Sequence, residues 1–116
     1  MISGIYNMTI EQGSTFNLLV YWKNSANNPI DMTNYTAKMQ IRSSTGASVK
    51  LLEISSDSGE IEIYPLQGSL NVKIGYLQTQ QLEPSVAVYD LELYAPTGEV
   101  YKLLKGRVRI EGEVTR

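Results

Sequence analysis

Alternation of apolar and polar residues with a period of two runs through almost the whole chain. In residues 35–42 every odd position is apolar, whereas the even positions hold Thr36, Lys38, Gln40 and Arg42. Successive side chains of a β-strand point to opposite faces, so this pattern predicts a strand with one face in the core and one in water. The same alternation recurs in residues 15–22, 61–64, 70–74 and 86–94. No segment sustains a 3.6-residue period, and the chain is therefore predicted to be all-β.

Clusters of turn-forming residues separate these segments. They are residues 23–29, Thr45-Gly46, Asp57-Ser58-Gly59, Gln67-Gly68 and Pro96-Thr97-Gly98. Short strands at such spacing are typical of a β-sandwich. Residues 76–82 are the exception, because this stretch before Pro84 predicts one or two helical turns that cross between sheets. Gly106 interrupts the last segment, residues 100–111, and predicts a β-bulge there.

The pattern as a whole predicts one domain, residues 1–116, folded as an immunoglobulin-like antiparallel β-sandwich of seven or eight strands. Trp22 on an early strand and the long connection around Asp31 are compatible with that arrangement, and the length allows one substantial core. Residues 31–34 predict a tight turn into the strand that begins at Tyr35. A small closed barrel is the competing architecture.

Histidine and cysteine are both absent from the 116 residues. This composition excludes disulfides, thiolate metal sites and a histidine general base. The ten basic and twelve acidic residues give a net charge of −2, and they are interspersed along the chain. That balance argues against nucleic-acid binding and against long-range electrostatic steering. No signal peptide and no apolar window of about 20 residues, the length that crosses a membrane, is visible.

Two acidic segments offer conventional site chemistry. Glu60 and Glu62 would project from one strand face roughly 6–7 Å apart, a spacing that suits glycoside hydrolysis. A general acid needs burial to raise its pKa, however, so a solvated sheet face is the preferred interpretation. Residues 57–60 could hold calcium, but a turn with Gly59 at a positive φ is the simpler reading. We assign no catalytic, cofactor-binding or metal-binding residue, and we predict that the protein is not an enzyme.

Tyrosine is the dominant aromatic residue, with eight copies against one phenylalanine and one tryptophan. A tyrosine ring packs against apolar groups while its hydroxyl reaches water or a partner. The alternation predicts that Trp22 and Tyr89 lie in the core and that Tyr21 and Tyr94 are largely exposed. Outward apolar residues of this kind are typical of a protein–protein contact surface, although tyrosines also stack on sugars. The interface candidates are Leu19, Tyr21, Val88 and Tyr94.

Three stretches of the chain resemble small proteins encoded in the structural regions of tailed bacteriophages and prophages. These stretches run from Tyr6 to Phe16, from Ile30 to Arg42 and from Val88 to Leu93. The ending from Leu103 to Arg116 also follows the family pattern. More distantly, the family resembles the immunoglobulin-like N-terminal domain of phage baseplate upper proteins.

The resemblance implies a non-enzymatic virion protein of a tail, baseplate or fibre attachment, made in the host cytoplasm and located in the virion. Its expected partners are other virion proteins, in several symmetric copies, with no nucleic acid, membrane or cofactor. We expect the chain to stand without a receptor-binding or fibre domain, which favours a connector role. Capsid decoration is the alternative location, and a carbohydrate-binding module is the alternative function. The edge strands that make contacts are expected at residues 5–11 and 107–114, because chain ends often lie at sheet edges.

Overall fold

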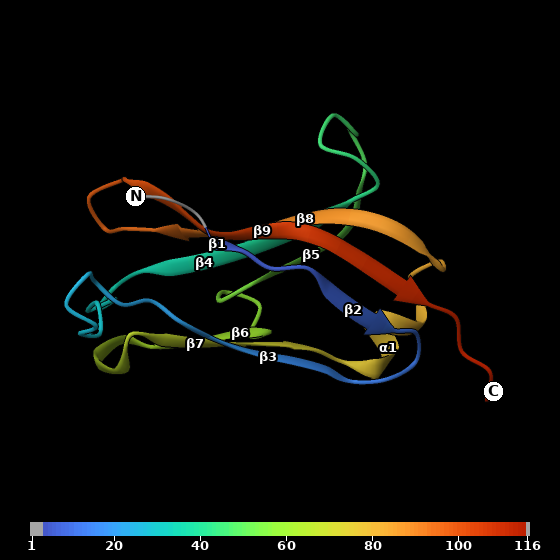
Figure 1. Cartoon of the computed structure of the whole chain (residues 1–116), viewed down its shortest axis with the longest axis horizontal. Coiled ribbons are helices and arrows are strands. Elements are labelled where there is room, and N and C mark those ends of the chain that lie inside the picture. The colour runs from blue at the N-terminus through green and yellow to red at the C-terminus, as the bar shows by residue number, and fades with distance from the viewer. Residues whose placement is uncertain (1–3, 116) are drawn as a thin grey trace.

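The structure, a computed structural model, describes residues 4–115. Within these residues the chain forms nine β-strands, one short α-helix and one 3₁₀ helix. The strands lie in two sheets that face each other (Figure 1). The prediction of an all-β chain is confirmed. The two sheets are separate, so the arrangement is layered rather than a closed barrel.

The larger sheet has six strands in the described part of the chain. They are β1 (Gly4–Ile5), β2 (Met8–Glu11), β4 (Thr36–Arg42), β5 (Lys50–Ser55), β8 (Ser85–Tyr94) and β9 (Val100–Glu111). Their order is β1-β9-β8-β4-β5, and β2 also pairs with β9. β1 and β2 run parallel to β9, whereas the other pairs are antiparallel. The prediction of a wholly antiparallel fold is therefore wrong at the N-terminal end, where one expected strand is also divided into two.

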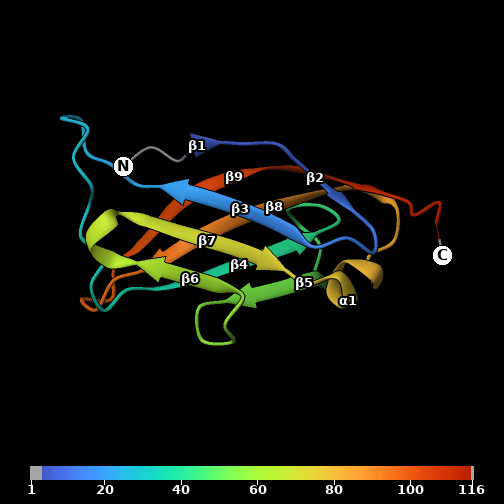
Figure 2. The same ribbon diagram turned by 90° about the horizontal axis from the view of Figure 1, so that it is seen from below.

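The smaller sheet contains β3 (Phe16–Tyr21), β7 (Ser69–Ile74) and β6 (Ile61–Tyr64), with β7 in the centre. The 3₁₀ helix η1 (Pro65–Gln67) joins β6 to β7, and Gly68 ends it at φ +61°. The helix α1 (Tyr76–Gln80) carries the chain from the smaller sheet to β8 (Figure 2). The prediction of a helical crossing in residues 76–82 is confirmed.

The core lies between the two sheets and is built from their inward-facing rows. Trp22 is 8% exposed and Tyr89 is 5% exposed, which confirms both as core residues. Most of the buried side chains are aliphatic, as the alternation predicts. The largest fully buried ones are Ile10, Met32, Met39, Ile41, Ile54, Leu70, Val72, Ile74, Leu91, Leu93 and Val108.

The predicted turn at residues 31–34 is present. The Thr33 amide donates a hydrogen bond to the Asp31 carboxylate at 2.9 Å, and Asn34 adopts a φ of +64°. Hydrogen bonds from the Thr33 side chain and backbone lower the pKa of Asp31. The Tyr35 amide then donates to the Met32 carbonyl at 3.0 Å, so the turn delivers the chain directly into β4.

The irregularity of β9 lies at Leu103 rather than at Gly106. The pairing of β9 with β8 passes from Leu104 to Lys102, which leaves Leu103 as the extra residue of a bulge. A one-residue shift exchanges the two faces of a strand, so Leu103 and Val108 are both buried although one is odd-numbered and the other even-numbered. The predicted bulge in this strand exists, but it lies at Leu103 and its predicted position at Gly106 is wrong.

Gly106 instead allows a close approach of the N-terminal segment. A Cβ atom at this position would lie 2.2 Å from the carbonyl oxygen of Tyr6. No side chain fits at that distance, so only glycine lets residues 6–7 lie directly on β9.

Candidate interaction surfaces

The four interface candidates lie on two opposite faces of the molecule. Leu19 and Tyr21 are on β3, on the outer face of the smaller sheet, and are 50% and 58% exposed. Val88 and Tyr94 are on β8, on the outer face of the larger sheet, and are half-buried. Leu19 and Tyr21 are therefore neighbours on β3, whereas Val88 and Tyr94 lie about 20 Å apart along β8, and the four do not form one surface.

Tyr94 is covered by its neighbours, and the prediction that it is largely exposed is wrong. Lys38 Nζ lies 5.8 Å from the centroid of the Tyr94 ring. The Tyr94 hydroxyl donates a hydrogen bond to Glu92 Oε1 at 3.3 Å. Burial, and then the charge of Glu92, raises the pKa of Tyr94. Long polar side chains on β8 itself and on the adjacent β4 thus shield an outward ring that alternation alone would leave in water.

The outer face of the smaller sheet holds two tyrosines on either side of Ser69. In the sheet register Ser69 lies opposite Tyr21 on β3 and opposite Tyr64 on β6. Ser69 is only 3% exposed despite its outward position, which we attribute to the two flanking rings. Lys23 Nζ lies 5.5 Å from the Tyr21 ring centroid. This face therefore presents a small apolar patch bordered by one cation.

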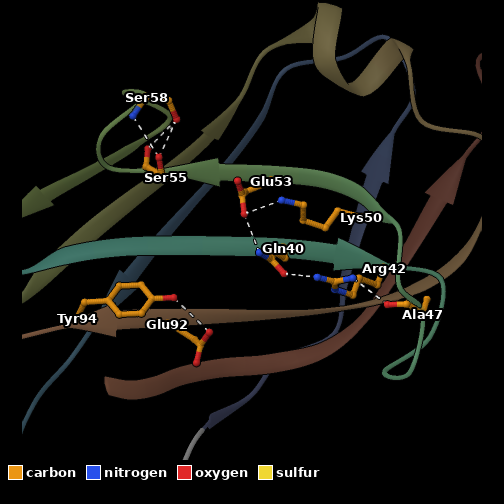
Figure 3. A network of polar contacts seen from close by, with 9 residues as sticks. All are labelled: Gln40, Arg42, Ala47, Lys50, Glu53, Ser55, Ser58, Glu92 and Tyr94. Carbon is orange, nitrogen blue, oxygen red and sulfur yellow. Dashed lines mark hydrogen bonds and ion pairs between the residues drawn. The ribbon is translucent and has the colours of Figure 1, made fainter. Parts of the chain in front are cut away.

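A chain of polar contacts joins β4 to β5 on the outer face of the larger sheet (Figure 3). Arg42 donates to the Ala47 carbonyl at 2.8 Å and to Gln40 Oε1 at 2.9 Å. Gln40 in turn donates to Glu53 Oε1 at 2.6 Å, and Lys50 Nζ lies 3.2 Å from the same oxygen. These hydrogen bonds, that from Gln40 foremost, lower the pKa of Glu53. Two cations of this face, Arg42 and Lys50, are therefore already engaged by partners within this chain.

Basic residues are concentrated on this outer face of the larger sheet. Seven of the ten basic residues occupy outward positions there, against five of the twelve acidic ones. The basic residues are Lys38, Arg42, Lys50, Lys102, Lys105, Arg107 and Arg109, and the acidic ones are Glu11, Glu53, Asp90, Glu92 and Glu111. The face is thus positive although the chain carries a net charge of −2. Charges that are interspersed along the sequence are thus partly sorted by the strands onto one side of the molecule.

Three adjoining shallow hollows with shared lining residues lie along β9 on this basic face, and together we call them the basic groove. The side chains that line it include Asn7, Thr45, Val86, Val88, Lys105 and Arg107. Within residues 4–115, the side chains of Lys105 and Arg107 make no ion pair or hydrogen bond. The sequence does contain a signal for this surface, which our prediction missed: Lys105, Arg107 and Arg109 alternate along the last strand.

Only one of the two predicted edge segments lies at a sheet edge. β1 and β2 border the larger sheet, whereas β9 lies between β8 and these two N-terminal strands. The prediction for residues 107–114 is wrong, because the parallel pairing of β1 and β2 covers β9. The other edges in the described part of the chain are β5, β3 and β6.

Glu60 does not have the environment of a general acid. It lies just before β6 and accepts hydrogen bonds from the Ser58 hydroxyl and from Gln78 Nε2, the latter at 3.1 Å. Burial raises the pKa of Glu60, but the hydrogen bonds outweigh it and leave the pKa below its ordinary value. Such a carboxyl is ionised at neutral pH, whereas a general acid must hold its proton. Gly59 has a φ of +92°, as the turn interpretation predicts.

Three aromatic rings meet at one end of the core, a contact that the sequence pattern did not predict. The ring centroids of Trp22 lie 6.2 Å from those of Tyr35 and 5.4 Å from those of Tyr101. Trp22 Nε1 is buried and has no hydrogen-bond partner among the described residues. Because the indole is almost fully buried, this cluster is a packing contact rather than an open platform for a ligand.

No protein-family model matches this chain, and a comparison with curated proteins finds no significant relative. The described residues contain no cluster of three or more acidic side chains arranged to hold a metal ion. Neither helix described above has the length and hydropathy needed to cross a membrane. Function must therefore be inferred from the surfaces of the chain and from the resemblance in its sequence.

Proposed function

We propose that this protein is a non-enzymatic structural component of a tailed-phage virion that acts as a connector in the tail, baseplate or fibre attachment. The observation that carries the proposal is the exposure of apolar side chains on two opposite faces. Leu19 and Tyr21 lie on one outer face, and Val86, which is 64% exposed, lies with Val88 on the other. A connector must contact two neighbours at once, and two opposed apolar faces suit that task.

The fold that accompanies this proposal is an immunoglobulin-like β-sandwich. Two facing sheets and a buried Trp22 just after β3 support it. In this chain, which has no cysteine, the packing of Trp22 against Tyr35 and Tyr101 takes the place of an intersheet disulfide.

Free strand edges provide a second means of contact. β2, β5 and β6 each present unpaired backbone groups on one side. A neighbouring chain can add a strand there through main-chain hydrogen bonds, with the exposed apolar residues nearby supplying side-chain contacts. The contacts of a connector would thus combine edges and faces.

Purified particles of the parent phage provide the test. Mass spectrometry should detect the protein in gradient-purified virions, with a non-virion phage protein as the control for carry-over. Cryo-electron microscopy should then show symmetric copies that each bury more than about 1,000 Å² against at least two different neighbours. Absence from virions would overturn the proposal, and contact with the capsid shell alone would replace the connector role with capsid decoration.

A carbohydrate-binding module is the alternative function, and one observation favours it. Tyr21 and Tyr64 lie on the same open face two strand spacings apart, about 10 Å, where their rings could stack on sugars. Against it, Tyr35, Tyr89 and Tyr101 are engaged in packing elsewhere. Titration of soluble glycans should therefore give no binding.

Monomeric glycan binding would favour the module if it is lost in Tyr21→Ser. The matched control is Tyr76→Ser, which removes a ring that is 56% exposed on α1.

A further inference from the structure

The basic groove along β9 contains two cations that have no ion-pair partner within residues 4–115. Lys105 and Arg107 have no partner among the described side chains, whereas Lys102 lies 3.5 Å from Asp90. Val86 borders the same groove and is 64% exposed. Unpaired cations beside an exposed apolar side chain fit a surface that offers carboxylates around an apolar centre.

The carboxylates interleaved on the same face argue against a nucleic acid in this groove. Asp90 and Glu92 point outward from β8, between the cations of β4 and β9. A phosphate backbone has one sign of charge throughout, so these carboxylates would repel it. A folded protein surface, in which acidic and apolar groups are mixed, fits the pattern better.

This chain presents such a surface on its opposite side. Asp57, Glu60 and Glu62 fall within six residues at the connection into β6, and Glu62 points outward from the smaller sheet. Gln78 joins Glu60 to α1, where Tyr76 and Leu77 are 56% and 61% exposed. We call Asp57, Glu60, Glu62, Tyr76 and Leu77 together the acidic surface.

Lys73 is the one basic residue on β7, and its amide donates to the Glu60 carbonyl. With three carboxylates against this single cation, the acidic surface keeps a net negative charge.

We propose that copies of this protein associate head to tail, with the basic groove of one copy docked on the acidic surface of the next. The two surfaces differ, because the groove follows β9 of the larger sheet whereas the acidic surface is formed by the β5–β6 connection, β6 and α1. The contact is therefore heterologous and propagates into a ring or a filament. The outer face formed by β5, β4, β8 and β9 covers roughly 600 Å² at ordinary strand spacing, enough for its half of a standard interface. The inference goes beyond the proposed virion role and stands or falls separately from it.

Sedimentation velocity of the purified protein tests the association without any mutation. At about 50 mM salt the protein should form oligomers whose size grows with concentration. At about 500 mM salt the apparent dissociation constant should rise at least about tenfold, because screening weakens contacts between opposite charges.

Two double variants test the pairing of the surfaces. The first, Lys105→Glu with Arg107→Glu, reverses the groove, and the second, Asp57→Lys with Glu62→Lys, reverses the acidic surface. All four side chains are exposed, so circular dichroism should show both variants folded. Each should be monomeric alone, and an equimolar mixture should associate, because each variant retains the native surface that the other lacks. Lys23→Glu, at the far loop, is the control and should associate like the unmodified protein.

Three results would overturn the inference. They are a protein that stays monomeric at low salt, association that both double variants leave intact, and variants whose mixture fails to associate. The proposed virion role fails by a different observation, the absence of the protein from particles. A protein that associates as described and is absent from virions would refute the function and leave the self-association established.

Discussion

The hydroxyl of Tyr89 donates a 2.6 Å hydrogen bond to the backbone carbonyl oxygen of Tyr6, 83 positions away in the sequence. Tyr89 points inward from β8, and Tyr6 lies between the two N-terminal strands. The bond passes beside Gly106 of β9, where the missing side chain leaves room for Tyr6. In addition to the pairing of β1 and β2 with β9, this hydroxyl therefore ties the edge of the larger sheet to the core.

Replacing Tyr89 by phenylalanine should lower the free energy of unfolding by about 1–2 kcal/mol, because the Tyr6 carbonyl loses its side-chain donor. Guanidinium denaturation measures the change. Tyr94→Phe is the matched control, since it removes only a 3.3 Å bond to Glu92 and should cost less than about 0.5 kcal/mol. Equal losses in the two variants would contradict a special role for Tyr89.

Gly106→Ala should displace the N-terminal strands. The new Cβ would meet the backbone of Tyr6, which cannot rotate away as a flexible side chain would. We expect a loss of about 1–3 kcal/mol in unfolding free energy. Amide hydrogen exchange should also become faster in β1 and β2 than in β4.

The control for this variant is Gly46→Ala, because a Cβ there would have no heavy atom within 4 Å. Its stability and exchange should match those of the unmodified protein. Unchanged exchange in β2 of Gly106→Ala would show that the contact does not hold the edge.

Strand positions and their inward faces could be predicted because both depend on local pattern. Met39 and Leu91 alternate with charged neighbours, and both are fully buried as predicted. The turn at residues 31–34 was equally predictable, since an Asp side chain bonds the backbone two residues on, whatever surrounds it.

What could not be predicted depends on pairing between distant segments. The parallel pairing of β2 with β9 joins the two ends of the chain, and no short-range signal encodes it. Once β2 covers β9, the predicted C-terminal edge disappears. The basic face could not be predicted for the same reason. Arg42 and Arg107 become neighbours of Val88 only through the register of three strands.

Trp22 and Tyr21 are adjacent in the chain and should differ sharply in their effect on stability. Trp22→Ala should cost about 3–5 kcal/mol, because it leaves a cavity beside Tyr35 and Tyr101. Tyr21→Ser should leave the melting temperature nearly unchanged, since the Tyr21 ring is 58% exposed. Thermal and chemical denaturation of both variants decide the matter, and a large loss for Tyr21→Ser would show that this ring belongs to the core.

The purified protein should hydrolyse neither glycosides nor esters. Glu60 is held ionised by its hydrogen bonds, and the chain has no histidine to activate a hydroxyl nucleophile. Chromogenic substrates provide the assay, with Glu60→Gln as the paired variant. Turnover that disappears in Glu60→Gln would overturn the non-enzymatic proposal, whereas turnover equal in both proteins would indicate a contaminant.

Alkaline pH should weaken the protein through Tyr89. Burial, and then the neighbouring Tyr6, raises the pKa of Tyr89 from 10.0 to about 12. Between these values the unfolded chain has lost the phenolic proton and the folded chain still holds it, so stability falls as pH rises. The contribution is complete below pH 10 and is lost as pH passes through about 12. Denaturation curves across this range should show a steeper decline for the unmodified protein than for Tyr89→Phe, which lacks the phenol while keeping every other titrating group. Identical slopes would show that Tyr89 ionises as readily in the folded protein as in the unfolded chain.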